Sequence, residues 1–189
     1  MKSAGLMPLV LLLSCAGNVP EQKPSAPVEK AHATGEAMAI RAVEFADGGE
    51  IPARCTCEGE DVAPTLRISG VPGGTVSLAL IVDDPDAPDP AAPKMVWVHQ
   101  VLFNIPPETG ELKAGAVPAS AVSGRNDWGE PGYRGPCPPV GRHRYFFRLF
   151  ALDAPLNLES PTRSELEQAM KGHVLATAQW MGTYAKSLQ

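Results

Sequence analysis

"TVSLALIVDDPDAP" at residues 75–88 is an almost continuous apolar run that ends in a proline-rich acidic corner. The run has the length of a β-strand and lacks polar alternation, so it indicates a strand buried on both faces. Asp84 and Asp86 follow its end, and Pro85 and Pro88 restrict the backbone around them. The stretch therefore predicts a central strand that holds two carboxylates in fixed directions at one end.

Other segments of the chain have strand character too. "MVWVHQVLFNIP" at 95–106 and "HRYFFRLFALD" at 143–153 are apolar runs of strand length. "MAIRAVEF" at 38–45 alternates as an edge strand does, and "HVLATAQWMGTY" at 173–184 favours a further strand over a helix. The sequence therefore predicts a mostly β domain around a sheet of three central strands.

"SPTRSELEQAMKG" at 160–172 is the one convincing helix in the sequence. Ser160 suits the N-cap, Pro161 suits the first helical position, and Gly172 suits the C-terminal stop. We expect this C-terminal helix to lie at the periphery of the sheet.

Each of the two later strands carries a polar pair near one end. Trp97 and His99 are two residues apart, so their side chains share one face of the strand. His143 and Tyr145 have the same spacing at the start of their strand. Together with the acidic corner at 84–86, these pairs indicate a polar site.

The composition limits the class of protein. A chain of 189 residues is long enough for one domain with a real core, and its 20 prolines and 18 glycines favour short strands over a helical bundle. The net charge of -5 leaves no broad basic surface, which disfavours nucleic-acid binding.

The first residues are typical of an export signal, with Lys2 before an apolar stretch at 6–13 that is too short to span a bilayer as a helix. The quartet Leu12–Cys15 resembles the lipobox of bacterial lipoproteins, which implies cleavage before Cys15 and lipidation of its sulfur. An ordinary signal peptide that happens to contain a cysteine is the alternative. We expect a signal peptide at 1–14, a lipid-anchored flexible linker at 15–37 and a folded domain at 38–187, in the cell envelope facing the periplasm or the exterior.

Three motifs in this order resemble the phosphatidylethanolamine-binding protein family, which includes the Raf kinase inhibitor proteins. They are "DPDAP" at 84–88, a histidine five residues before "NIP" at 104–106, and "GPCPP" at 135–139 followed by "HRYFFRLFALD". The likeness covers roughly residues 38–186 and points to the bacterial and archaeal branch. It implies a β-sandwich with a small pocket at one end that takes phosphate or phospholipid head groups.

Carried over position by position, the resemblance assigns ten residues to the pocket. They are Asp84, Asp86, Pro88, Trp97, His99, Gly135, Pro138, Pro139, His143 and Tyr145. Each polar member also has a plainer alternative, because aspartates before prolines form turns and histidines or tyrosines are often packed core residues with bonded polar tips.

A phosphate next to Asp84 and Asp86 needs compensation for the repulsion between like charges. We expect protonated His99 and His143, with backbone N–H groups at 132–137, to supply it. Phosphate affinity should then fall as pH rises through the histidine pKa.

The resemblance and the absence of catalytic motifs favour a binding module over an enzyme. The sequence has no G-x-S-x-G turn, no H-E-x-x-H motif and no G-x-x-x-x-G-K-[ST] loop, and it predicts no cofactor. Two alternatives stay open. One is an inhibitor of a protease or another enzyme of the envelope, and the other is a metal-dependent hydrolase built on two aspartates and two histidines.

The cysteines beyond Cys15 are Cys55, Cys57 and Cys137, and we expect an oxidising compartment for them. Cys55 and Cys57 are poorly placed to bond each other, because residues two apart on an extended chain have Cα atoms about 6.5 Å apart. Cys57 and Cys137 fall in the family-like segments "TCEG" and "GPCPP", so a disulfide, if one forms, is expected between them. Three buried thiols are the alternative.

Overall fold

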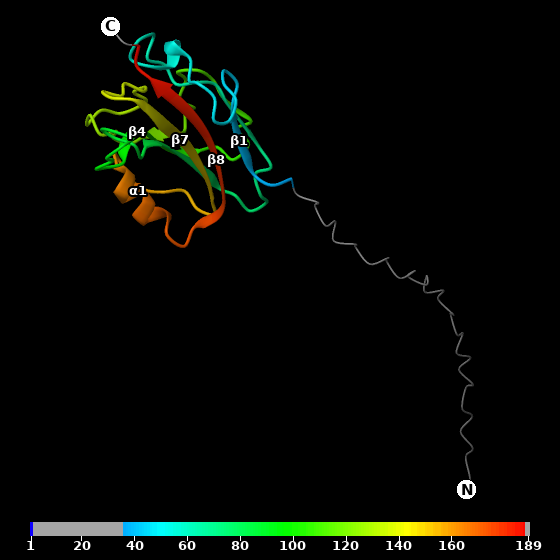
Figure 1. Cartoon of the computed structure of the whole chain (residues 1–189). Coiled ribbons are helices and arrows are strands. Elements are labelled where there is room, and N and C mark those ends of the chain that lie inside the picture. Colours follow the sequence, from blue (N-terminus) through cyan, green and yellow to red (C-terminus); the bar gives the residue numbers. More distant parts are fainter. Residues whose placement is uncertain (2–35, 188–189) are drawn as a thin grey trace. The chain divides into compact units, whose positions relative to one another are not determined.

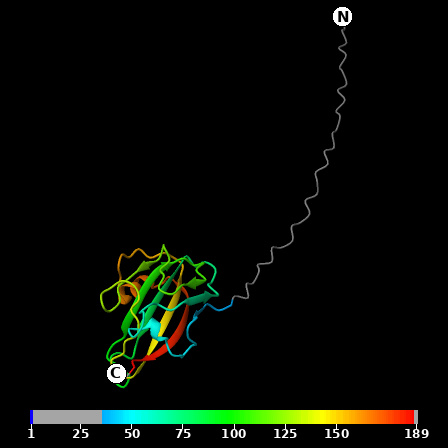
Figure 2. The ribbon, with the colours of Figure 1, turned by 90° about the horizontal axis from the view of Figure 1, so that it is seen from above.

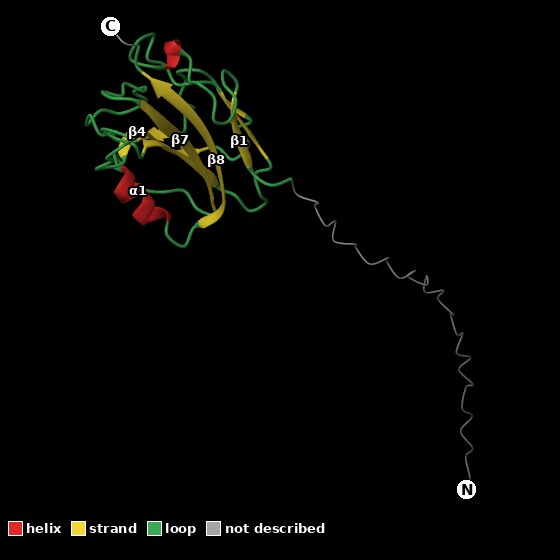
Figure 3. Cartoon of the chain, in the orientation of Figure 1, coloured by secondary structure: helices red, strands yellow, loops and turns green. Residues whose placement is uncertain are grey.

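The computed structural model describes Met1 and residues 36–187, which form two β-sheets and one α-helix (Figures 1 and 3). The smaller sheet contains β1 (Ala39–Ala42), β2 (Leu66–Ser69) and β5 (Glu111–Leu112), in the order β1-β2-β5. The larger sheet has the order β6-β4-β3-β7-β8, with β6 (Val122–Ser123), β4 (Trp97–Ile105), β3 (Ser77–Asp84), β7 (Arg142–Leu152) and β8 (Val174–Ala185). The helices are α1 (Arg163–Met170) and a 3-10 turn, η1 (Ala53–Cys55). The prediction of a mostly β sandwich with a peripheral C-terminal helix is confirmed.

Strand β3 lies at the centre of the larger sheet and pairs antiparallel with β4 and β7. Strand β7 pairs on its other side with β8, and Figure 2 shows yellow β7 running beside red β8. All eight residues of β3 are buried, as the unbroken apolar run predicted. Because side chains alternate along a strand, Asp84 shares a face with Val82, whereas Asp83 shares the opposite face with Ile81. The two adjacent aspartates therefore serve different faces of the sheet.

An apolar core covers each face of the larger sheet. One core lies between the two sheets and joins Ile40 of β1 to Leu80 of β3. The other joins Phe103 of β4 to Leu166 of α1. Figure 1 shows α1 and β1 on opposite sides of the strands of the larger sheet. Burial on both faces explains why the central strands have continuous apolar sequences.

Helix α1 begins two residues later than the sequence predicted. The N-cap is Thr162 rather than Ser160, and Pro161 precedes the cap. The reason is a capping box: the Thr162 hydroxyl accepts a hydrogen bond from the Glu165 N–H, and the Glu165 carboxylate accepts one from the Thr162 N–H. The helix ends at Met170, and Gly172 follows with φ +83°, as expected of a glycine after a helix.

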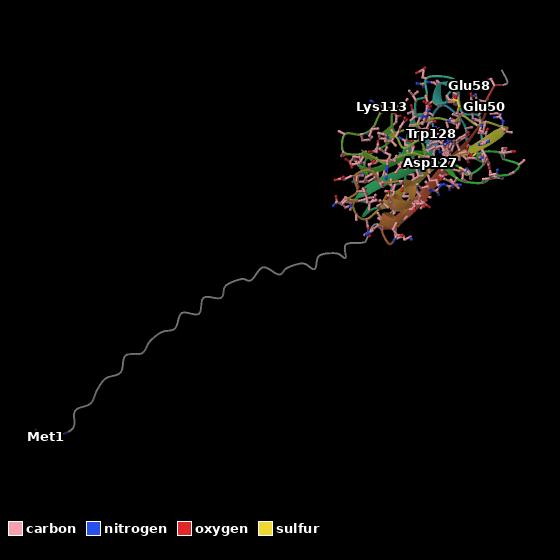
Figure 4. The ribbon with its side chains drawn as sticks, turned by 90° about the vertical axis from the view of Figure 1, so that its left-hand side faces the viewer. Met1, Glu50, Glu58, Lys113, Asp127 and Trp128 are labelled. Atoms are coloured by element: carbon pink, nitrogen blue, oxygen red, sulfur yellow. A yellow bond between two sulfur atoms is a disulfide. The ribbon has the colours of Figure 1, made fainter. Side chains whose placement is uncertain are left out.

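The end of β8 is fixed to the segment around 47–58. Thr183 exchanges backbone hydrogen bonds with Gly49 and Ile51, and the Tyr184 hydroxyl donates to Glu58. Glu50 and Glu58 accordingly lie near each other at this end of the domain (Figure 4). This segment leads directly into the loop that supports the candidate site.

The predictions for the N-terminal region lie outside the described residues. They concern the signal peptide after Met1, lipidation at Cys15 and the linker up to residue 35. Within the part of the chain that the structure describes, no helix is both long and apolar enough to cross a membrane.

Candidate functional site

A cavity of about 400 Å³ lies where three strands of the larger sheet end together. Because β3 is antiparallel to β4 and β7, its last residue, Asp84, lies beside the first residues of both neighbours. The cavity is lined by Asp84, Ala87, Pro88, Met95, Trp97, His99, Trp128, Cys137, Pro138, Pro139, His143 and Tyr145. Eight of the ten predicted residues are in this lining, and Asp86 and Gly135 are not.

Asp84 and His143 form a buried pair in the cavity wall. One oxygen of Asp84 accepts a hydrogen bond from the Asp86 N–H at 2.8 Å, so the residue also forms the turn. Its other oxygen lies 2.7 Å from Nδ1 of His143, and Nε2 of the same ring lies 2.9 Å from the Val140 carbonyl. Both ring nitrogens therefore face acceptors, and only the imidazolium form donates to both. The two hydrogen bonds fix the orientation of the ring and leave neither of its nitrogens free for a ligand.

Asp86 does not face the cavity, which corrects its assignment to the pocket. Its carboxylate accepts two hydrogen bonds from the Arg144 guanidinium, at 2.7 and 2.9 Å, and one from the Arg144 N–H. These bonds lower the pKa of Asp86. The physical reason is the pleat, since Arg144 lies on the face of β7 opposite to His143 and Tyr145.

His99 sits in a β-bulge. The register of β3 and β4 shifts from Val82 opposite Gln100 to Asp83 opposite Val98, which leaves His99 without a partner on β3. The freed backbone binds the loop at 134 instead: the Arg134 N–H donates to the His99 carbonyl, and His99 Nδ1 lies 2.6 Å from the Arg134 carbonyl.

The expected charge on His99 is a second correction. Burial lowers the pKa of His99, and the hydrogen bond to the Arg134 carbonyl and the negative charge of Asp84 only partly oppose this shift. The aspartate of the site pairs with His143 and not with His99. His99 is therefore a neutral group near pH 7 rather than the cation that the sequence suggested.

Tyr145 presents an unpaired hydroxyl. The residue is 1% exposed, lines the cavity, and its hydroxyl has no hydrogen-bond partner among the described residues. It makes no hydrogen bond of ordinary geometry to Asp84, but burial, the negative charge of Asp84 and a weak contact with that carboxylate all raise its pKa, so the hydroxyl remains a donor. Its ring meets that of His99 edge-on, with centroids 5.2 Å apart.

The loop after residue 132 forms one cavity wall and is tied to the segment at 53–61. Cys57 and Cys137 form a disulfide with Cα atoms 5.4 Å apart, which confirms the expected pairing. The Gly135 N–H donates to the Asp61 carboxylate at 2.6 Å, and a side chain at Gly135 would collide with the Cys55 carbonyl. Gly135 therefore supports the wall from behind and does not line the cavity, which corrects its assignment.

Sequence reasoning missed four of the lining residues, Ala87, Met95, Trp128 and Cys137 as a wall residue. Trp128 matters most, because its ring contacts both Trp97 and His99 at centroid distances of 5.2 Å and carries the Arg134 guanidinium 4.8 Å above it. The sequence does carry a signal for Trp128, because a single tryptophan in a loop rich in glycine and proline is a candidate binding residue.

The metal alternative gains no support from the side chains. Among the described residues, no group of three or more His, Cys, Asp or Glu side chains is arranged to hold a metal ion. Asp84 and His143 bond each other, and His99 Nδ1 bonds a carbonyl, so these groups already have partners.

Comparison with known proteins decides the family. A sequence profile described as "Phosphatidylethanolamine-binding protein" matches residues 41–185, which is most of the chain. The chain belongs to the phosphatidylethanolamine-binding protein family. The resemblance drawn from the three motifs is confirmed.

Members of the family from bacteria and archaea match over nearly their full length. A UPF0098 protein of Methanothermobacter thermautotrophicus is 50% identical over 155 residues, covering 79% of this chain and 99% of the relative. The crystal structure of a phosphatidylethanolamine-binding protein homologue from Chlamydia trachomatis superposes with a TM-score of 0.75 at 42% identity, covering 80% of this chain and 99% of that one. YbcL of Escherichia coli gives a TM-score of 0.72 at 30% identity, with 80% and 100% covered.

Proposed function

We propose that the chain is a non-enzymatic binding module whose cavity holds a small oxyanion, either free phosphate or the phosphate of a phospholipid head group. The observation that carries the proposal is the buried Tyr145 hydroxyl, which has no partner among the described residues. A buried unpaired hydroxyl costs about 1 to 3 kcal/mol, and an anion oxygen in the cavity would accept its hydrogen bond. The family's description as phosphatidylethanolamine-binding supports this choice of ligand.

The rest of the cavity suits a small ligand with an apolar neighbour. Its volume of about 400 Å³ is in the range of small-molecule sites, and most of its walls are Trp, Pro, Met and Ala side chains. Its polar lining groups, Asp84, His99, His143 and Tyr145, are at most 4% exposed, whereas Met95 is 48% exposed, so the polar groups lie deeper than this part of the apolar wall. Such a cavity accepts a head group at its polar end and leaves the apolar rim for the attached chain.

Isothermal titration calorimetry with inorganic phosphate tests the proposal. We expect wild type to bind with a stoichiometry near one, and Tyr145→Phe to weaken binding roughly 10-fold because an anion oxygen loses a donor. Tyr184→Phe is the matched control, since its hydroxyl bonds Glu58 outside the cavity, and it should leave the affinity unchanged. Absence of phosphate and head-group binding to wild type, or equal affinity of wild type and Tyr145→Phe, would reject the proposed role.

We further propose that this module is carried by a lipoprotein anchored at Cys15, in the cell envelope. The lipobox-like quartet at 12–15 supports this. Replacing Cys15 with serine should move the protein from the membrane fraction to the soluble fraction, because several acyl chains at about 0.8 kcal/mol per buried methylene are lost. Cys55→Ser, which also removes one thiol, should leave the protein with the membranes. Membrane retention of Cys15→Ser would rule out this anchor.

The inhibitor alternative remains a prediction. A pull-down from envelope extracts with wild type and Tyr145→Phe distinguishes the roles. Recovery of the same enzyme by both forms would favour a protein-inhibitor surface outside the cavity.

A further inference from the structure

We infer that the cavity selects an anion that also brings a hydrogen-bond donor, because the free nitrogen of His99 accepts a hydrogen bond and cannot give one. This inference rests on the proposed anion site and adds the property that its ligand must have. The shared ligand chemistry is an oxyanion with either a P–OH group or a nearby ammonium.

The tautomer of His99 follows from its partner. Nδ1 lies 2.6 Å from the Arg134 carbonyl, and a carbonyl oxygen only accepts, so Nδ1 carries the proton. In the neutral ring Nε2 is then a lone-pair acceptor. His99 lines the cavity, and its Nε2 makes no hydrogen bond to any described residue. A fully deprotonated anion oxygen placed against Nε2 would meet a lone pair.

The bulge makes this arrangement rigid. The Arg134 N–H also donates to the His99 carbonyl, so two hydrogen bonds join His99 to the backbone of the same residue. The rings of Trp128 and Tyr145 meet the imidazole edge-on, each with a centroid distance of 5.2 Å. A flip of the ring would break the 2.6 Å hydrogen bond and leave the Arg134 carbonyl without this donor.

The groups around His99 keep it neutral near pH 7. Burial lowers its pKa, while the negative charges of Asp84, Asp127 and Asp61 and the hydrogen bond to Arg134 oppose that shift without cancelling it. The Asp84 carboxylate bonds His143, so it is not a hydrogen-bond partner of His99. The Arg134 side chain is directed to Trp128 and Glu130 and gives His99 no acceptor either. Tyr145 is then the donor of the site and His99 its acceptor.

Phosphate and sulfate provide the first test, because they share size and shape but only phosphate retains a proton near neutral pH. At about pH 8 we expect wild type to bind phosphate at least ~10-fold more tightly than sulfate. Equal affinities would overturn the inference and leave the anion site standing. Binding of neither ion, nor of the two head groups below, would overturn the proposed function as well.

Phosphoethanolamine and phosphocholine identify the source of the donor. At about pH 8 the phosphate monoester has lost its second proton, since that pKa is about 6, so only the ethanolamine ammonium still donates. We expect phosphoethanolamine to bind at least ~10-fold more tightly than phosphocholine. Tighter binding of phosphoethanolamine than of inorganic phosphate supports the inference with a head-group ligand, and the reverse order supports it with free phosphate. Equal binding of the two head groups would contradict it.

A His99→Gln variant and a pH series complete the design. The glutamine amide can turn its NH₂ toward the cavity, so the preference for phosphate over sulfate should shrink toward 1-fold in this variant. In wild type, sulfate affinity should rise only well below the ordinary histidine pKa of about 6.5, because burial lowers the pKa of His99 and so delays its second proton. The contrary result is a wild-type sulfate affinity that equals the phosphate affinity and stays constant from about pH 8 to 5. It would show that His99 does not set the preference for phosphate over sulfate.

Discussion

Replacing Asp83 with alanine is expected to lower the free energy of unfolding by about 3 to 5 kcal/mol, the usual cost of breaking a buried ion pair. The Asp83 carboxylate is completely buried and lies 2.8 Å from Nε of Arg148 and 3.0 Å from an Nη of Arg163. It thereby joins β3, β7 and α1 on the helix-covered face of the sheet. Urea denaturation followed by circular dichroism measures the change.

The matched control is Glu111→Ala, which removes an ion pair with Arg67 on the protein surface. Exposed pairs contribute about 0 to 1 kcal/mol, so this change should be small. If Asp83→Ala cost no more than Glu111→Ala, the carboxylate would not hold the helix to the sheet. Phosphate affinity should be nearly unchanged in Asp83→Ala, because the cavity opens on the other face.

Removal of the Cys57–Cys137 disulfide, by the double replacement with serine, is expected to destabilise the fold by about 2 to 5 kcal/mol. The bridge closes a loop between cysteines 80 residues apart, and long loops lose the most chain entropy in the unfolded state. Because Cys137 lines the cavity, phosphate affinity should fall together with stability. Chemical denaturation and calorimetric titration on the same samples measure both effects.

Cys55 supplies the control for this experiment. It is the free thiol among the described cysteines, is fully buried, and burial raises its pKa to about 11, so it is a poor nucleophile near neutral pH. A Cys55→Ala protein should keep the bridge and still lose stability on addition of reductant. A serine double variant as stable as wild type would show that hydrogen bonds alone, such as Gly135 to Asp61, hold the cavity wall.

Much of the fold follows from local patterns in the sequence. The apolar run that becomes β3 is buried on both faces, so its character is visible without knowledge of its partners. The i, i+2 spacing of His143 and Tyr145 places both in the cavity wall, and that spacing depends only on strand geometry. Family motifs supplied the rest of the pocket, including the pairing of Cys57 with Cys137.

What the sequence did not reveal depends on contacts between distant segments. Asp86 pairs with Arg144, 58 positions later, and nothing local marks that choice. The bulge at His99 depends on the register of β3 against β4, and it decides which ring nitrogen faces the cavity. The neutral state of His99 could not be predicted from the sequence either, because it depends on how deeply the folded protein buries the ring.

A crystal structure of the protein grown from saturating phosphate tests the central claim most directly. The account predicts tetrahedral density in the cavity, with one oxygen within hydrogen-bond distance of the Tyr145 hydroxyl and another facing Nε2 of His99. Ordered water alone in the cavity, with the Tyr145 hydroxyl bonded only to that water, would contradict it.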